Sequence, residues 1–317
     1  METHVEPQTE LRPLYGNINK VFLVDASWLL HKSFFGYPDF SMLDERTGIV
    51  TSTGDIHGFL YGLLMIIRRS PDASIILCLD SRNNTRKEEN SEYKADREFR
   101  PEIWSKLFEI IQSASLFPHV YLSASDGFEG DDVVYTLAKR FSGVVPEVLI
   151  YGYDKDLMQS VSDRCFLWNK CEGQKFLKRG VAEVKEIFEG CEPQNTSFFR
   201  SLCGGDSSDS MKAAYPRFPH RLGVQVANLF GCPENFLKSD YYGEKKCDKK
   251  WIEMLRDNPD PMMSVYNIMK SRFIENLPVY RCNSSWEYIT RYRLKVVQGD
   301  FEKFLLFSSG GYVSLRL

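Results

Sequence analysis

The chemistry most visible in this sequence is that of repeated carboxylates. Five short motifs carry them: V-D-A-S, C-L-D, E-G-D-D, Y-D-K-D and G-G-D-S-S-D. Their acidic residues are Asp25, Asp80, Glu129, Asp131, Asp132, Asp154, Asp156, Asp206 and Asp209. Taken alone, each motif fits an ordinary role as a turn cap, a helix start or a polar loop. Their order, and their place after candidate strands, favour one shared site.

Such a gathering of carboxylates needs cations. Two like charges about 4 Å apart repel by roughly 4 kcal/mol at an effective dielectric of 20. Several such pairs would exceed the net stability of a whole domain, about 5–15 kcal/mol. Ligands that are all oxygen suit Mg²⁺, with Mn²⁺ as the alternative, better than zinc or copper. We therefore predict two or more Mg²⁺ ions, which could activate water and stabilise the leaving oxygen in phosphodiester cleavage.

The elements that would position these acids alternate between strand and helix. Short apolar runs that end in aspartate predict buried parallel strands at 21–26, 74–80 and 148–156. Helices are predicted between them at 54–69, 101–117 and 130–141. This alternation predicts an α/β fold with a doubly wound, mostly parallel sheet. Because ligands gather outside the carboxyl ends of such strands, the fold itself would bring the aspartates together.

Charge and composition narrow the function further. The chain has 317 residues and a net charge of −3, yet residues 210–317 carry more Lys and Arg than Asp and Glu. An acidic N-terminal part and a basic C-terminal part indicate a metal site and a polyanion-binding surface, with a chance distribution of charge as the alternative. No run of about 18 apolar residues occurs, so no membrane span is expected.

Cysteine usage and the first residues bear on the compartment. Eight cysteines are scattered without C-x-x-C or zinc-ligand spacing. This pattern favours reduced thiols in a cytoplasm, the host cytoplasm if the chain is viral. Residues 1–18 are polar and lack a signal-peptide core, so we expect a disordered lead-in there.

As a set, the motifs resemble those of the flap endonucleases and 5′→3′ exonucleases, including the phage and bacterial polymerase-associated 5′-nucleases. The resemblance spans about 21–230 and includes T-G-D-I-H-G-F-L at 53–60. It implies a PIN-like, Rossmann-like core with a helical arch and a helix-hairpin-helix-like DNA-binding region. The expected organisation is the lead-in, a nuclease core over 19–195 with its arch at about 82–100, and a helical DNA-binding and C-terminal region over 196–317.

The resemblance also assigns the carboxylates to metal ions. It implies a tighter site built by Asp80, Glu129, Asp131 and Asp132. A second site would be built or supported by Asp154, Asp156, Asp206 and Asp209. Asp25 would act partly through metal-bound water.

The arch would supply cations to the reaction. Its charged composition predicts an exposed loop that buries no core face. The spacing R-x6-Y-K-x2-R places catalytic candidates at Arg86, Tyr93, Lys94 and Arg97. In the family, a basic residue here reaches the scissile phosphate, where it would neutralise charge developing on the phosphoryl oxygens. The aromatic ring could stack on a frayed base.

The region expected to bind duplex DNA departs from the sequence pattern of the family. In place of a glycine-rich hairpin with a bound K⁺, this chain has A-A-Y-P-R-F-P-H-R-L-G, so the resemblance does not carry a K⁺ site over. Lys212, Arg217 and Arg221 could still contact phosphates as point charges. The lysines at 245–250 would bind duplex or a partner, or simply solubilise a loop.

The predicted function is a metal-dependent, structure-specific 5′-nuclease acting in DNA replication, repair or primer removal. Its partners would be DNA with 5′ flaps, nicks or ends, RNA–DNA hybrids as in RNase H-like primer removal, and a DNA polymerase or single-strand-binding protein. The alternatives are a catalytically reduced DNA-binding protein of the same fold, a PIN-type ribonuclease and a topoisomerase-primase type domain. The complete set of carboxylates argues against a catalytically reduced protein, and the arch argues against a PIN-type ribonuclease. A topoisomerase-primase type domain would leave Asp25 and Asp80 without a role.

Overall fold

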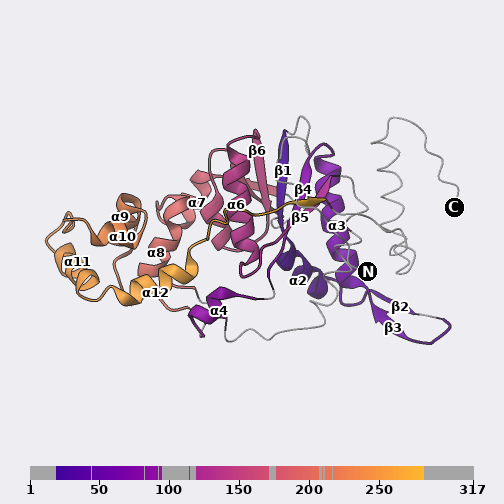
Figure 1. Ribbon diagram of the computed structural model, residues 1–317, viewed down its shortest axis with the longest axis horizontal. Helices are drawn as coiled ribbons and strands as arrows, with labels where there is room; N and C mark the ends of the chain where they lie inside the picture. The colour runs from indigo at the N-terminus through magenta and orange to yellow at the C-terminus, as the bar shows by residue number, and fades with distance from the viewer. Residues whose placement is uncertain are drawn as a thin grey trace. The chain divides into compact units, whose positions relative to one another are not determined.

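The computed structural model describes residues 19–43, 45–81, 83–91, 93–94, 114, 119–170, 176–206, 209, 211–215 and 217–281. Figure 1 labels most of their helices and strands. The described residues fall into two compact units, the first within 1–79, 99–123 and 278–317 and the second within 80–98 and 124–277. The predicted lead-in and most of the helix predicted at 101–117 lie outside the described residues.

A mostly parallel sheet organises the first unit. Its strands β1, β4, β5 and β9 are neighbours in that order, over Lys20–Asp25, Ser74–Cys78, Val120–Ser123 and Tyr280–Arg281. β1 pairs in parallel with β4, and β4 with β5, whereas β9 is antiparallel to β5. Two short strands, β2 (Ser41–Leu43) and β3 (Val50–Ser52), form an antiparallel hairpin. The strands predicted at 21–26 and 74–80 are confirmed, with small shifts at their ends.

Two helices pack closely in this unit. α2 spans Ala26–Gly36 and α3 spans Gly54–Arg69, the latter with the predicted bounds. Their close approach depends on glycine, because a Cβ added at Gly58 would lie 2.7 Å from the Cβ of Ser33. A larger side chain at this position would therefore push the two helices apart.

The second unit also contains parallel strands and a helix. β6 (Glu147–Tyr151) pairs in parallel with β7 (Cys165–Lys170), which is antiparallel to β8 (Phe176–Arg179). α6 spans Gly130–Ser142 and buries its apolar face, which confirms the helix predicted at 130–141. With the first unit, these elements confirm an α/β fold with mostly parallel strands and flanking helices.

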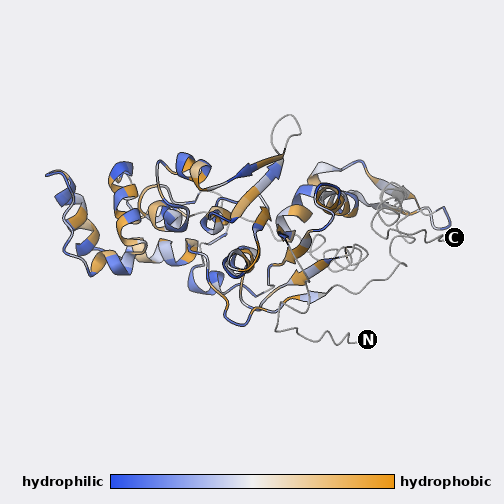
Figure 2. Ribbon diagram, turned by 90° about the horizontal axis from the view of Figure 1, so that it is seen from above, coloured by the Kyte–Doolittle hydropathy of each residue, from blue (hydrophilic) through white to orange (hydrophobic). Residues whose placement is uncertain are grey.

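Further helices complete the second unit: α4 (Thr85–Glu89), η1 (Asp156–Ser160), α7 (Val181–Ile187), η3 (Pro193–Asn195), α8 (Thr196–Cys203), α9 (His220–Phe230), α10 (Pro233–Leu237), α11 (Asp248–Asp257) and α12 (Asp260–Met269). Many show hydrophobic residues on one side and hydrophilic residues on the other (Figure 2). In the described ranges, no helix combines the length and the apolar character needed to cross a membrane. The predicted boundary near 195, between a nuclease core and a DNA-binding region, falls inside this unit. Because that boundary separates functions, it stays a prediction.

A strap, residues 269–277, begins at the last residue of α12 and runs along α6. The Ile274 N–H donates to Thr136 Oγ1 over 3.0 Å, and Arg140 Nη1 donates to the Leu277 carbonyl over 2.9 Å. Arg140 also donates to the carbonyl of Ile274 over 2.7 Å. These contacts hold the strap against the helix whose first turn carries Asp131 and Asp132.

Candidate active site

Five of the predicted metal ligands meet within the second unit. One group consists of Asp131, Asp154 and Asp156, and another of Asp156, Asp206 and Asp209. In each group, carboxylate oxygens lie within 4.8 Å of one another. Because Asp156 belongs to both groups, these five residues form a continuous set, here called the acidic cluster.

Local structure explains how three of these aspartates are presented. Asp131 lies in the first turn of α6, where the partly positive helix terminus favours a carboxylate. Asp156 opens the short helix η1, and its N–H donates to Asp154 Oδ1 over 3.0 Å. This turn after β6 folds the Y-D-K-D motif back on itself and presents both acidic side chains to the cluster.

A tight turn presents Asp206 and Asp209. The Asp206 N–H donates to the Met211 carbonyl over 2.6 Å, and the Met211 N–H donates back over 2.7 Å. Gly205 enters this turn with φ +60°, and a Cβ there would lie 2.4 Å from the Ala213 nitrogen. Only glycine fits this conformation and this space. The second glycine of G-G-D-S-S-D is therefore a geometric requirement of the turn.

Arg200 is a member of the site that the sequence analysis missed. It lies on α8, its side chain is 5% exposed, and its guanidinium forms ion pairs with Asp156 and Asp206. It thus bridges two carboxylates of the acidic cluster. The available signal was that Arg200 is the only charged residue in T-S-F-F-R-S-L-C, where burial of the helix would require an acidic partner.

The protonation of Asp156 reflects its crowded surroundings. Burial is the largest influence and raises the pKa of Asp156 to about 7, with further increases from Asp154, Asp206 and Asp209 against the opposing charge of Arg200. Carboxylates that resist ionisation together are relieved by a cation. The oxygen-only donors and this mutual repulsion fit a hard divalent ion.

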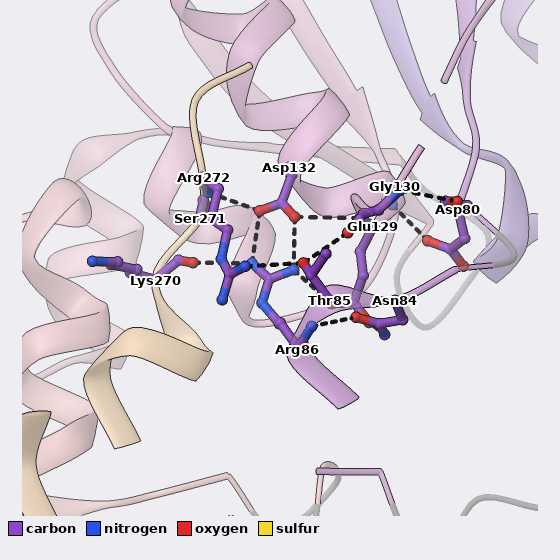
Figure 3. Close-up of polar contacts among 12 residues, drawn as sticks. Asp80, Asn84, Thr85, Arg86, Glu129, Gly130, Asp132, Lys270, Ser271 and Arg272 are labelled. Atoms are coloured by element: carbon purple, nitrogen blue, oxygen red, sulfur yellow. Dashed lines mark hydrogen bonds and ion pairs between the residues drawn. The ribbon is translucent and has the colours of Figure 1, made fainter. Parts of the chain in front are cut away.

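Arg86 joins three parts of the unit (Figure 3). Its Nη1 and Nη2 donate to the two carboxylate oxygens of Asp132 over 2.6 and 2.7 Å. Nη1 also donates to Glu129 Oε2 over 2.9 Å, and Nε donates to the Ile268 carbonyl over 2.8 Å. Its side chain is buried. The predicted exposure of Arg86 is therefore wrong, because its charge is needed inside to balance two buried carboxylates.

Glu129 has every oxygen occupied by donors. Besides Arg86, its carboxylate accepts from Lys94 Nζ over 2.6 Å, the Tyr93 hydroxyl over 2.8 Å and Asn84 Nδ2 over 2.7 Å. Although burial opposes ionisation, Lys94 and Arg86 lower the pKa of Glu129 to about 2. In this arrangement Glu129 and Asp132 are neutralised by side chains of the protein.

The predicted arch residues have mixed outcomes. Tyr93 is 4% exposed and packs with Met211 and Val265, so the prediction that the segment buries no core face is wrong there. Lys94 has φ 53°, an uncommon value for a residue with a side chain, and its Nζ lies 4.0 Å from Asp209 Oδ2. Arg97 lies outside the described residues. Catalytic roles for these residues stay predictions.

The remaining predicted ligands follow strands. Asp80 Oδ1 accepts from the Gly130 N–H over 2.5 Å, at the start of α6 (Figure 3). Asp25 ends β1 in the first unit, where its Oδ1 accepts from the Trp28 N–H over 2.9 Å. Asp25 therefore caps α2, as the structural alternative for its motif allows.

The predicted phosphate contacts lie at the surface. Lys212, Arg217 and Arg221 are all exposed, and the first two lie in the connection 204–219 between α8 and α9. Arg221 Nη2 donates to Oδ1 of the buried Asp248 over 2.5 Å. Arg221 is thus already paired with a carboxylate, whereas Lys212 and Arg217 are exposed on the connection between α8 and α9.

Comparison with known proteins gives a family match. Residues 20–189, more than half of the chain, match the family described as "5'-3' exonuclease, N-terminal resolvase-like domain". The "5'-3' exonuclease" of Aquifex aeolicus is 28% identical over 220 residues, which cover 69% of this chain and 72% of that protein. The thermostable DNA polymerase I of Thermus thermophilus is 28% identical over 233 residues. The match covers 72% of this chain but 26% of the polymerase.

Solved structures share the fold at low sequence identity. The T5 D15 protein co-crystallised with metal ions has a TM-score of 0.58 and 12% identity, over 90% of this chain and 96% of that one. The catalytic core of Rad2 in complex with DNA substrate has a TM-score of 0.53 and 13% identity, over 95% of each chain. These likenesses extend the shared fold beyond the residues that match the family.

Proposed function

Since the chain belongs to the 5′-3′ exonuclease family, and is thus a phosphodiester hydrolase, we propose that it cuts DNA near 5′ ends in a structure-specific reaction that requires Mg²⁺. The observation that carries this proposal is the acidic cluster, whose two groups of carboxylate oxygens share Asp156. Arg200 balances part of this negative charge, but one guanidinium does not offset five carboxylates.

The cluster would hold two divalent ions. Asp131, Asp154 and Asp156 would hold one, and Asp156, Asp206 and Asp209 the other. Bound ions of this kind lower the pKa of water and stabilise charge on phosphoryl oxygens. Asp80, Glu129 and Asp132 would support the first group. Mn²⁺ should be able to take the place of Mg²⁺.

Cations of the protein would assist at the same place. Lys94 lies between Glu129 and Asp209, so a phosphate drawn to the acidic cluster would meet its ammonium group. Such a contact would stabilise the negative charge that develops in the transition state. Tyr93 and Arg97 would act beside it on the displaced strand, whereas Arg86 would act by holding Glu129 and Asp132 in place.

The proposed substrates are DNA flaps, nicks and 5′ ends, with RNA–DNA hybrids as an extension to primer removal. Solved structures of this fold include a bacteriophage T5 D15 flap endonuclease with DNA and metal ions and human GEN1 with Holliday junction DNA. A DNA polymerase or single-strand-binding protein is the proposed partner, since the related segment is part of DNA polymerase I in Thermus. We propose a cytoplasmic location.

A cleavage assay with defined substrates tests this function. We expect 5′-labelled flap, nicked and single-stranded DNA to be cut with Mg²⁺ and left intact with EDTA. Asp154→Asn should lower the rate at least about a hundredfold, because it removes a charged ligand of the first group. The matched control is Asp163→Asn, at an exposed position outside the acidic cluster, which should cut normally. DNA binding without cleavage by the wild-type chain would instead favour the catalytically reduced alternative.

A further inference from the structure

A buried glutamine connects the strap to the acidic cluster. Gln159 lies on η1, three residues after Asp156, and is 4% exposed. Its Nε2 donates to the Met269 carbonyl over 3.0 Å and to Asp156 Oδ1 over 3.4 Å. Its Oε1 accepts from the Ser271 N–H over 3.1 Å. Both amide hydrogens and one acceptor position are therefore engaged.

The chemistry of the side chain matches these partners. The strap offers a carbonyl and, two residues later, an N–H, and an amide can accept from one while donating to the other. A carboxylate could not donate to Met269, and an apolar side chain would leave these backbone groups without their hydrogen bonds. The remaining amide hydrogen is directed to Asp156, the carboxylate that both candidate metal groups share.

We infer that Gln159 is a positioning residue that orients Asp156 and couples metal binding in the acidic cluster to the strap. The inference rests on the proposed function, because it assumes that the cluster binds divalent ions. Partners that orient a ligand from outside commonly change metal affinity by about 10–100-fold when removed. Since Asp156 serves both groups, a change in its orientation acts on both at once. The strap lies beyond residues 20–189, so it is a part of the site that the family match does not contain.

Coupling of this kind works in both directions. If the strap helps to orient Asp156, an ion bound by Asp156 must stabilise the strap by the same free energy. Metal ions should then slow hydrogen exchange in residues 269–277, although the strap itself supplies no carboxylate to the acidic cluster. This effect distinguishes a coupled glutamine from one that only fills space.

The strap offers a matched control for the experiment. Thr136 is fully buried, and its Oγ1 accepts from the Ile274 N–H over 3.0 Å. Thr136→Val removes this strap contact while keeping the shape of the side chain. The Thr136 hydroxyl also donates to the Arg272 carbonyl over 3.4 Å, so both of these hydrogen bonds join α6 to the strap. Gln159→Met likewise keeps the length of the side chain and removes its hydrogen bonds.

Calorimetric titration of the full chain with Mn²⁺, without DNA, tests the inference. We expect Gln159→Met to weaken Mn²⁺ binding by about tenfold or more, and Thr136→Val to leave it within about twofold of wild type. Mn²⁺ should slow exchange in 269–277 in wild type and in Thr136→Val, but not in Gln159→Met. Wild-type affinity in Gln159→Met, or equal weakening in both variants, would overturn the inference.

Two further measurements keep the outcomes separate. Thermal unfolding in EDTA shows whether Gln159→Met folds; if it does not, Gln159→Asn retains the amide but shortens its reach, and it too should weaken Mn²⁺ binding. Wild-type affinity in that variant would overturn the inference. Mn²⁺ binding by a wild-type chain that cuts no DNA would refute the proposed function and leave the role of Gln159 standing.

Discussion

Asp156 is the residue at which the repulsion between carboxylates of the site is concentrated, because both groups of the cluster include it. It belongs to both groups of the acidic cluster, pairs with Arg200 and receives a hydrogen bond from Gln159. Burial and neighbouring carboxylates hold its pKa at about 7, above the ordinary value of 3.8. The folded chain therefore binds a proton at Asp156 over a pH range in which the unfolded chain has released it.

This difference predicts a pH-dependent stability in EDTA. Because the folded pKa is raised, the free energy of unfolding should fall as pH rises from about 4 to about 7, by an amount on the order of 1–4 kcal/mol. Denaturant unfolding at pH 4 and pH 7 measures the change. Asp156→Asn has no titrating group at this position, so its loss should be smaller, and saturating Mg²⁺ should protect the wild type at pH 7. Parallel pH curves for wild type and Asp156→Asn would contradict this account of the residue.

Arg200 should act as the resident cation of the acidic cluster. Arg200→Gln removes a buried charge from between Asp156 and Asp206, and we expect a loss of about 3–5 kcal/mol in EDTA. Mg²⁺ should restore part of it by neutralising the same carboxylates. Lys249→Gln is the control, because its pair with Glu253 is largely exposed and is worth less than about 1 kcal/mol. A small loss at Arg200 that Mg²⁺ leaves unchanged would show that the arginine does not balance the cluster.

At the scale of elements, the turn 205–211 determines whether two of the five aspartates reach the cluster. A Cβ at Gly205 would collide with backbone atoms of 211–213, whereas a Cβ at Gly204 would meet nothing within 4 Å. We therefore expect Gly205→Ala to weaken Mg²⁺-dependent cleavage at least about tenfold and to lower stability by roughly 1–3 kcal/mol. Gly204→Ala should be close to wild type in both. The comparison uses the cleavage rate over a range of Mg²⁺ concentrations, and equal behaviour of the two variants would remove the geometric role of Gly205.

The elements themselves were largely predictable, and the charge pairing was not. Apolar runs and helical spacing identified β1, β4, β6, α3 and α6, because local periodicity reports which face is buried. Arg86 shows the limit: its exposure was predicted from a charged neighbourhood, yet its partners Glu129 and Asp132 lie 43 and 46 residues away. Arg200 was missed for a related reason, since Asp156 lies 44 residues away and Asp206, six residues away, reaches it only through the turn after α8. The five residues of the acidic cluster, in contrast, were among the predicted ligands because several acidic motifs occurred in a specific order; that they bind metal stays a prediction.

At the scale of the whole molecule, charge is unevenly divided. The net charge of −3 would repel a polyanion, so DNA must be held by a local basic surface if the proposed function is right. Lys212 and Arg217 are exposed on the connection between α8 and α9, whereas Arg221 is paired with Asp248. Lys249 and Lys250 are equally exposed on α11. Position, rather than total charge, should therefore decide which of these residues contribute to binding.

Salt dependence of duplex binding separates position from total charge. Each phosphate contact that is lost should reduce the slope of log K against log salt by about 0.9. We expect the double variant Lys212→Gln, Arg217→Gln to lower the slope by up to about 2 and to weaken binding at low salt. The double variant Lys249→Gln, Lys250→Gln removes the same charge and should change the slope by less than about half as much. Fluorescence anisotropy in EDTA, with a nicked duplex, measures both without cleavage. Equal slopes for the two variants would mean that only the overall charge matters. The connection between α8 and α9 would then have no specific role in DNA binding.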